Sequence, residues 1–347
     1  EMADTLSSVS LLNNTADLRA FHPGTNDKSG VITVQANVTN IPAPVINWSN
    51  IGGATNVSFS NSGSVNTQIS GIIPGLHQVR ISARNGATMA PSTPQTSTFT
   101  LCVPQFIRIT EDATKFNSVL NSYHVSHLKD RIVSEMKATC DSLLSTANAR
   151  TVWQLGSFTE TVPAHIPASR INIVEILDVN PTRPSLLGLT DTNHTGVGAN
   201  IYNERIELYP GAYINTVTNS DLGIDVETQA LVMQLSSMSF TDPDLEEFAV
   251  KIFGRLIGET MAHEILHSLL GLISTSPADG HNRPAISNDI MNRGFERTFT
   301  QRTGLVDNAH TSPVLPSNFT DNGISAINRL QAANQARIDT IFPINPA

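Results

Sequence analysis

The sequence predicts two domains, an all-β sandwich over residues 1–103 and an α+β domain over residues 104–347. The chain of 347 residues is longer than a typical single domain of about 100–150 residues. In the first third, short segments alternate apolar and polar residues, as half-buried strands do. After residue 103, apolar residues recur at steps of three and four over long segments, which indicates amphipathic helices.

The strand signals of the first domain are short and regularly spaced. They lie at residues 32–38, 45–48, 57–59, 79–83 and 99–103. Turn residues such as Gly52-Gly53 and Asn85-Gly86 separate them, which favours an antiparallel sandwich. Trp48 on an early strand resembles the core tryptophan of immunoglobulin-like domains. The cysteine pair usual in such domains is missing, so this resemblance concerns architecture only. Residues 1–30 are either an extension or a first strand.

The second domain mixes strands with long helices. Strands are expected at residues 106–110, 171–178 and 201–209, and helices at residues 125–143, 243–270 and 321–338. Charges are interspersed in residues 201–209, as in an edge strand, and such an edge could pair with an extended peptide. Pro243 and Asp244 are suited to begin the middle helix. This order predicts an α+β fold.

Composition excludes several functions. The net charge is −9 and no dense Lys/Arg run occurs, which argues against a nucleic-acid partner. No apolar stretch of about 18 residues occurs, so no transmembrane segment is expected. The opening residues lack a signal-peptide pattern, but the Asn-, Thr- and Ser-rich, Lys-poor composition favours a secreted or cell-surface protein.

The two cysteines, Cys102 and Cys140, cannot define a disulfide framework. They either bridge the start of the second half of the chain to a helix, or both are buried thiols. No Cys-x-x-Cys pair occurs, so a zinc site in this chain would need histidine and carboxylate ligands.

The chemistry is concentrated in residues 263–267, His-Glu-Ile-Leu-His, inside the predicted helix 243–270. His263 and His267 are four apart, so they lie on one helix face and can bind one zinc ion. Glu264 lies beside the first ligand, where it can act as general base towards a zinc-bound water. Such polar residues would be costly to bury in an apolar helix unless something pairs them.

With this motif, the chain resembles the metzincin clan of zinc metallopeptidases. The resemblance rests on His263-Glu264-Ile265-Leu266-His267 followed by Gly271, a later histidine, and Ile290-Met291-Asn292, which is similar to the clan's Met-turn. It covers about residues 104–347. It implies a zincin-like fold with an active-site helix, a Zn²⁺ cofactor, and Met291 beneath the metal.

The third ligand departs from the clan's long motif, because Gly271 comes one residue late and no His or Asp stands three residues beyond it. His281 is the favoured third ligand, since neutral imidazole is the commoner zinc ligand and Gly280 lets the backbone turn. Asp279 is the alternative. Glu296, 29 residues after His267, would fit a glutamate-ligand arrangement.

These features predict a zinc-dependent endopeptidase that hydrolyses protein or peptide substrates, with Glu264 as general base and no further cofactor. The alternative is an adhesion or structural surface protein with a vestigial, non-catalytic peptidase fold. A latent enzyme, covered by its N-terminal segment, is a third possibility. The oligomeric state is left open.

Overall fold

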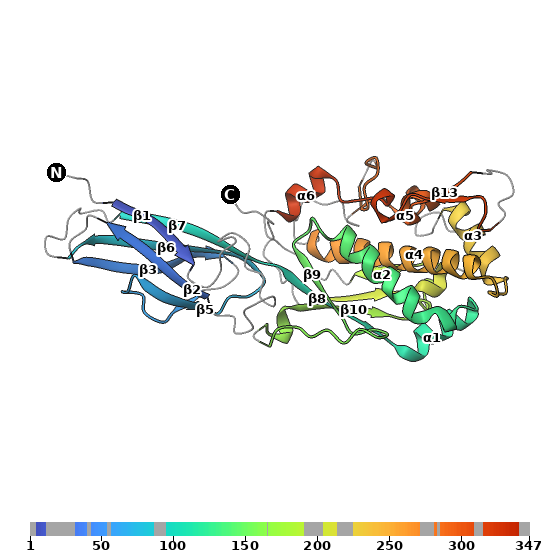
Figure 1. The fold of residues 1–347 in the computed structure, drawn as a ribbon, viewed down its shortest axis with the longest axis horizontal. Helices are drawn as coiled ribbons and strands as arrows, with labels where there is room; N and C mark the ends of the chain where they lie inside the picture. The colour runs from blue at the N-terminus through green and yellow to red at the C-terminus, as the bar shows by residue number, and fades with distance from the viewer. Residues whose placement is uncertain are drawn as a thin grey trace. The chain divides into compact units, whose positions relative to one another are not determined.

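A computed structural model describes most of the chain in two units. The described residues are 5–11, 32–39, 43–53, 57–86, 95–164, 166–190, 204–213, 225–270, 281–282, 285–308 and 315–339. The first unit comprises residues 1–105, 162–170 and 339–347, and the second comprises residues 106–161 and 171–338 (Figure 1).

The described strands of the first unit form two antiparallel sheets. These strands are β1 (Thr5–Leu11), β2 (Ile32–Thr39), β3 (Pro44–Gly53), β4 (Ser58–Phe59), β5 (Asn66–Ser70), β6 (Gly75–Asn85) and β7 (Gln95–Val103). One sheet has the order β1-β2-β5-β4 and the other β3-β6-β7. The strand signals at residues 32–38, 45–48, 79–83 and 99–103 each fall within one of these strands, and the signal at residues 57–59 overlaps β4, which begins at Ser58. Residues 1–30, which were expected to be either an extension or a first strand, contain the strand β1. Strand β5 was not predicted.

Trp48 joins the two sheets of the first unit. Its ring on β3 stacks on Phe59 of β4 with centroids 6.4 Å apart, and its indole N–H donates to the Ser64 carbonyl. Val79 and Ile81 of β6 are fully buried on the inner face, as the alternation predicts. The immunoglobulin-like assignment remains a prediction, because no observation beyond this packing tests it.

The second unit is built on a sheet whose described strands have the order β11-β12-β10-β8-β9. Their bounds are β8 (Gln105–Glu111), β9 (Ala149–Trp153), β10 (Ile171–Ile176), β11 (Gly188–Thr190) and β12 (Arg205–Leu208). β8, β10 and β12 run parallel, and β11 is antiparallel to β12. Buried residues in β8 and β10 account for the apolar runs read from the sequence.

The edge strand differs from the sequence-based expectation. Residues 201–209 were predicted to be an edge, but β12 within them pairs with β10 on one side and β11 on the other. The charged residues of β12 do not mark an edge, since Arg205 forms an ion pair with Glu175 of the neighbouring strand β10 at 2.5 Å. Among the described strands the terminal one is therefore β11, a three-residue segment too short to give a periodic signal.

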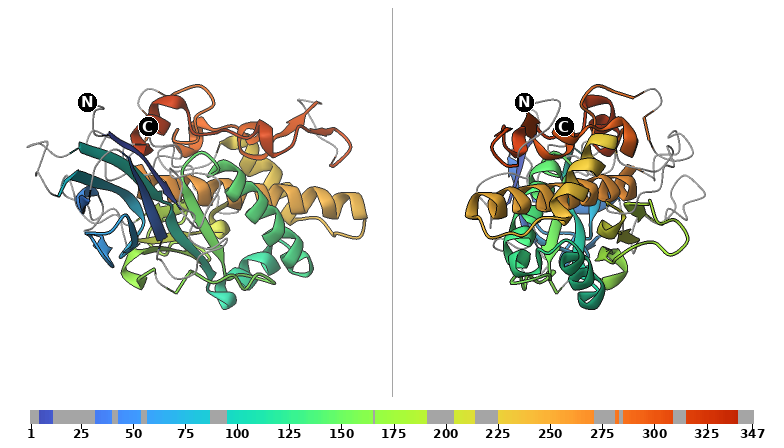
Figure 2. Two further views of the ribbon diagram at one scale, coloured as in Figure 1. Left: turned by 60° about the vertical axis from the view of Figure 1, so that its left-hand side comes forward. Right: turned by 90° about the vertical axis from the view of Figure 1, so that its right-hand side faces the viewer.

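The described helices of the second unit pack on this sheet and on one another. Their bounds are α1 (Ala113–Ser122), α2 (Lys129–Leu143), α3 (Val226–Ser236), α4 (Pro243–Leu270), α5 (Phe299–Thr303) and α6 (Ala332–Ile338), with the two-stranded pair β13 (Leu305–Asp307) and β14 (Phe319–Asp321) beside α5. α2 and α4 lie side by side (Figures 1 and 2). Gly258 permits this approach, because a Cβ there would lie 2.7 Å from the Met136 carbonyl oxygen.

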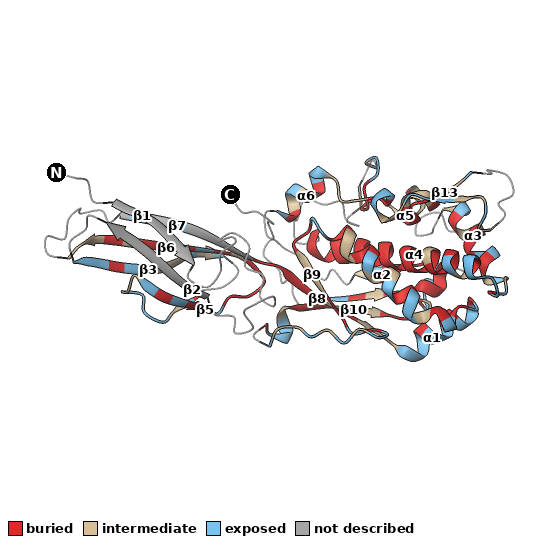
Figure 3. Ribbon diagram, in the orientation of Figure 1, coloured by how far each residue is buried: buried red, intermediate tan, exposed pale blue. Residues whose placement is uncertain are grey.

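Helix α4 is buried along almost its whole length (Figure 3). It has apolar residues on every face, as expected of a helix in the centre of a domain. None of the helices in the described ranges combines the length and apolar character needed to cross a bilayer. Cys140 on α2 is a buried free cysteine, and the side chain of Cys102 lies outside the described part of the structure.

The last predicted helix is wrong as a continuous element. Residues 321–338 contain a short 3₁₀ helix, η5 (Ile324–Ala326), and then α6. Between them, Ile327 has extended backbone, and Arg329 forms a parallel bridge with Asp289. Pairing with the distant segment 288–290 therefore overrides the local helical pattern.

Candidate metal centre

His263 and His267 lie one helical turn apart on α4 and point to the same place. Their Nε2 atoms are 3.0 Å apart, and the two rings are nearly perpendicular. This follows from the local sequence alone, because residues four apart share a helix face. The regular hydrogen bonding of a long buried helix holds both Cα positions.

His281 approaches from an irregular segment and joins this pair. Its Nε2 lies 3.2 Å from Nε2 of His263 and 3.3 Å from Nε2 of His267. Among the described residues, these three histidines form a cluster whose possible ligand atoms all lie within 4.8 Å of one another. His281 is partly exposed, whereas His263 is buried.

The donor set fits a zinc ion. Nitrogens at about 2.0–2.1 Å from a tetrahedral ion stand about 3.3 Å from one another. The three observed separations of 3.0, 3.2 and 3.3 Å are close to that value. Three histidines leave a fourth position open, which is the arrangement of catalytic rather than structural zinc sites.

The protonation state of His263 also suits a metal ligand. Its Nδ1 lies 2.6 Å from the carbonyl oxygen of Ile290, which can only accept, so Nδ1 carries the proton and Nε2 presents its lone pair. Burial, with the neighbouring Arg297 charge and the other two histidines, holds the pKa of His263 well below its usual value. His263 is therefore neutral at pH 7, the form that binds metals.

Glu264 is held beside this centre by the terminal strand β11. The Thr190 hydroxyl lies 2.9 Å from Glu264 Oε2 and 2.8 Å from the Glu264 carbonyl oxygen. Gly188 lies against the carboxylate, because a Cβ there would be 2.5 Å from Glu264 Cγ. Burial raises the pKa of Glu264 to about 7, although the Thr190 hydrogen bond opposes the shift. A carboxyl group with such a pKa can take up and release a proton near neutral pH.

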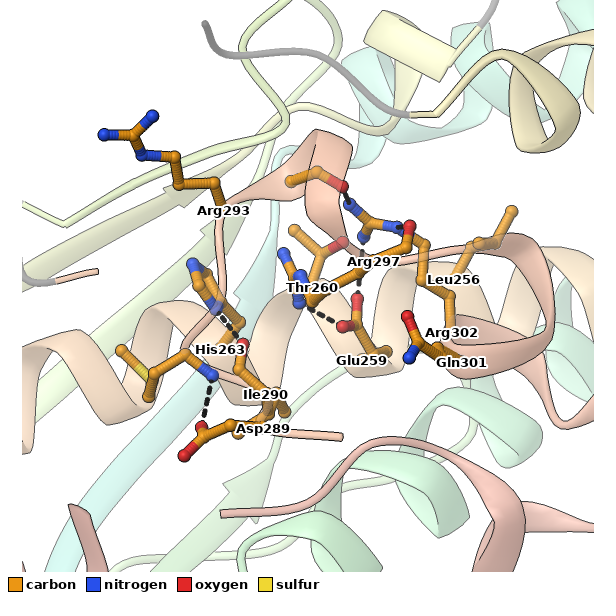
Figure 4. A network of polar contacts seen from close by, with 12 residues as sticks. Leu256, Glu259, Thr260, His263, Asp289, Ile290, Arg293, Arg297, Gln301 and Arg302 are labelled. Atoms are coloured by element: carbon orange, nitrogen blue, oxygen red, sulfur yellow. Dashed lines mark hydrogen bonds and ion pairs between the residues drawn. The ribbon is translucent and has the colours of Figure 1, made fainter. Parts of the chain in front are cut away.

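A buried ion cluster lies one turn before His263 on α4 (Figure 4). Glu259 pairs through one oxygen with Arg297 and through the other with Arg302 at 2.9 Å. All three side chains are almost inaccessible to solvent. Burial and the neighbouring Arg302 lower the pKa of Arg297 to about 10, which still leaves it charged at pH 7. Two cations and one anion give this cluster a net positive charge.

Met291 is buried in a turn that touches the centre through its backbone. The Met291 N–H donates to Asp289 Oδ1 at 2.8 Å, and its carbonyl accepts from the Asn282 N–H at 3.1 Å. The preceding residue, Ile290, carries the carbonyl that accepts from His263 (Figure 4). The predicted Met-turn segment therefore lies against the first histidine.

The remaining candidate ligands are placed as follows. Asp279 lies outside the described residues. The Glu296 carboxylate accepts from the Arg293 backbone N–H at 3.1 Å, within the 3₁₀ helix η4 (Gly294–Glu296), and is not part of the histidine cluster. Among the described candidates, His281 alone joins the helix pair.

Sequence reasoning missed the residues that surround the three histidines. Gly188 and Thr190 sit in a strand too short to detect, and Arg297 and Arg302 follow no recognisable motif. The Asn-rich run around Met291, with Asn288, Asp289 and Asn292, was a visible signal for a turn stabilised by side chains.

No protein-family model matches the chain, and no curated relative matches its sequence. Among solved structures, a sialyltransferase from Photobacterium damsela is 12% identical in sequence, with a TM-score of 0.18. That alignment covers 74% of this chain and 50% of the sialyltransferase chain, so this chain spans about half its length.

Proposed function

We propose that the protein is a zinc-dependent endopeptidase of the metzincin type, with Glu264 as general base. The single observation that carries the proposal is the convergence of three imidazole Nε2 atoms beside a buried carboxylate. On this proposal the second unit is the catalytic domain. The first unit is an immunoglobulin-like sandwich that positions or targets it in a secreted or cell-surface protein.

The roles of the residues follow from their positions. His263, His267 and His281 would hold the ion, which when bound would supply a polarising charge and a water of lowered pKa. Glu264 accepts the proton of the attacking water on a carboxylate oxygen and returns it to the amine nitrogen that leaves. Thr190 keeps that carboxylate in place by its hydrogen bond of 2.9 Å.

The substrate class follows from strand β11. Among the described strands, β11 is last in its sheet, and its Gly188 and Thr190 both contact Glu264. An extended peptide that added to β11 by main-chain hydrogen bonds would pass the carboxylate that takes up the proton. This supports a polypeptide substrate, and it moves the peptide-pairing edge from residues 201–209 to residues 188–190.

The test compares Glu264→Gln with the wild type. Because the glutamine cannot take up a proton, we expect casein cleavage to fall by about 10²–10⁴-fold. Zinc content should remain at one ion per chain, since no proposed ligand is altered. Glu296→Gln is the matched control, because the Glu296 carboxylate accepts from the Arg293 backbone N–H and lies outside the histidine cluster, and this variant should keep wild-type activity.

Two results would contradict the proposal. Full activity in Glu264→Gln would exclude the general-base role. A wild-type protein that binds zinc stoichiometrically but cleaves no peptide library would favour the alternative, an adhesion or structural protein with a vestigial peptidase fold.

A further inference from the structure

We propose that Asn334, on the C-terminal helix α6, is a positioning residue that holds the third imidazole, His281, in place for the metal. This inference rests on the proposed metal centre. His263 and His267 need no such device, because α4 sets their spacing. His281 lies on an irregular segment, so its position must be set by contacts from elsewhere in the fold.

The contacts run from Asn334 to the residue next to His281. Asn334 Nδ2 donates to Asn282 Oδ1 at 3.0 Å and to Asp289 Oδ2 at 3.0 Å. Asn282 Nδ2 donates in turn to Asn292 Oδ1 at 2.9 Å. Because one peptide bond joins Asn282 to His281, fixing the Asn282 side chain restricts the backbone that carries the imidazole.

The same network supports the first histidine through the turn. Asp289 accepts from Asn334 through Oδ2 and from the Met291 N–H through Oδ1. The Ile290 N–H donates to the Arg329 carbonyl, and the Ile290 carbonyl accepts from His263. The C-terminal segment 329–334 therefore contacts the supports of two of the three imidazoles.

Burial makes this arrangement specific. Asn334 is only 4% exposed and Asp289 is fully buried. Both amide hydrogens of Asn334 have acceptors, and its oxygen accepts from Arg337 Nη1 at 3.2 Å. Rotating this amide away would remove one donor from the buried Asp289 carboxylate and leave it only the Gln331 N–H at 3.4 Å on that oxygen, which is costly. Asn334 is thus held in a single orientation, which is what a positioning residue requires.

The test measures zinc affinity by competition with a fluorescent chelator. Loss of partners that orient metal ligands typically weakens binding by roughly 10–100-fold, and we expect Asn334→Ala to fall in that range. Asn328→Ala is the matched control. Asn328 is 2% exposed and nearby in sequence, but its side-chain nitrogen has no hydrogen-bond partner among the described residues. The zinc affinity of Asn328→Ala should change by less than about threefold, which is well below the roughly 10–100-fold loss expected when an orienting partner is removed.

Two further measurements separate positioning from general destabilisation. The metal-free variants are compared by circular dichroism and thermal midpoint, to establish that they fold. The effect of Asn334→Ala is then measured in a His281→Ala background. If Asn334 acts through His281, the double variant should bind zinc no more than about twofold more weakly than His281→Ala alone.

The outcomes are distinct. An unchanged zinc affinity in Asn334→Ala overturns the inference but leaves the metal centre intact. An equal loss with and without His281 also overturns it, because the effect would then act through the Asp289 turn or the fold and not through His281. If the wild type binds zinc no better than a His263→Ala/His267→Ala variant, the proposed function fails and the inference fails with it.

Discussion

The two halves of the candidate metal centre are built in different ways. His263, Glu264 and His267 share one long buried helix, whose internal hydrogen bonds set their spacing. His281 and Met291 lie on irregular backbone, which Asn282, Asn292 and Asn334 join by side-chain hydrogen bonds. The geometry of a helix is set by hydrogen bonds between its own residues. The geometry of the irregular half depends on hydrogen bonds to residues up to 52 positions away.

This difference implies two ways for the centre to fail. Changes that affect the buried ion cluster of α4 should mainly lower the stability of the fold, because α4 is the centre of the second unit. Changes that affect the irregular half should lower metal affinity while the fold persists. The following experiments test this distinction.

Glu259→Gln should have the largest effect on stability. It leaves Arg297 and Arg302 buried without their carboxylate, and breaking such a pair costs roughly 3–5 kcal/mol. We expect the upper end, because two cations lose their partner. Urea denaturation measures the loss. Glu247→Gln, on the same helix but exposed, should change the unfolding free energy by less than about 1 kcal/mol. Similar losses in both variants would mean that the buried cluster does not anchor α4.

Removing a single proposed ligand should have the second-largest effect in free energy, here on zinc affinity. We expect His263→Ala and His281→Ala each to weaken binding by roughly 10³-fold, about 4 kcal/mol, more than the 10–100-fold typical of orienting partners. Titration calorimetry with zinc measures both. Wild-type affinity in His281→Ala would assign the third position to another residue, and Asp279→Ala would then be the variant to test.

The buried base should make the metal-free protein sensitive to pH. The pKa of Glu264 is raised from its ordinary 4.5 to about 7, so the folded state keeps a proton that the unfolded state releases. Stability is therefore complete below about pH 4 and is lost as the pH rises through about 7. Glu264→Gln imitates the protonated form, so the metal-free variant should be more stable than the wild type at pH 8. The difference should be at most about 3 kcal/mol and vanish near pH 4.

Denaturation of the two metal-free proteins at several pH values checks this expectation. A stability difference that is the same at pH 4 and pH 8 would show that the substitution acts through packing rather than through the carboxylate charge.

Gly188→Ala should have the smallest effect, on the rate of peptide cleavage. It tests whether helix α4 positions Glu264 without help from β11. The new Cβ would lie 2.5 Å from Glu264 Cγ, so the carboxylate must move. We expect kcat/KM for peptide cleavage to fall about tenfold, or 1.4 kcal/mol, with zinc affinity unchanged. A wild-type rate would mean that α4 alone positions the base and that β11 adds nothing.

The sequence-based expectations divide along the same line. The helix 243–270, the strands at 106–110 and 171–178, and most strands of the first unit were predictable, because their signals are periodic and local. The helix expected over residues 321–338 and the edge strand expected at residues 201–209 were wrong. In both cases a partner distant in sequence, the turn at Asp289 or strand β11, decided the conformation.

By itself the sequence determined that His263, Glu264 and His267 share one helix face, because the period of an α-helix is a local property. For the third ligand, the sequence left three candidates, His281, Asp279 and Glu296. Tertiary structure decided that the His281 imidazole meets the other two and that Glu264 lies between Gly188 and Thr190. The reason is physical: irregular backbone takes its position from buried hydrogen bonds to distant residues, and no local pattern records those partners.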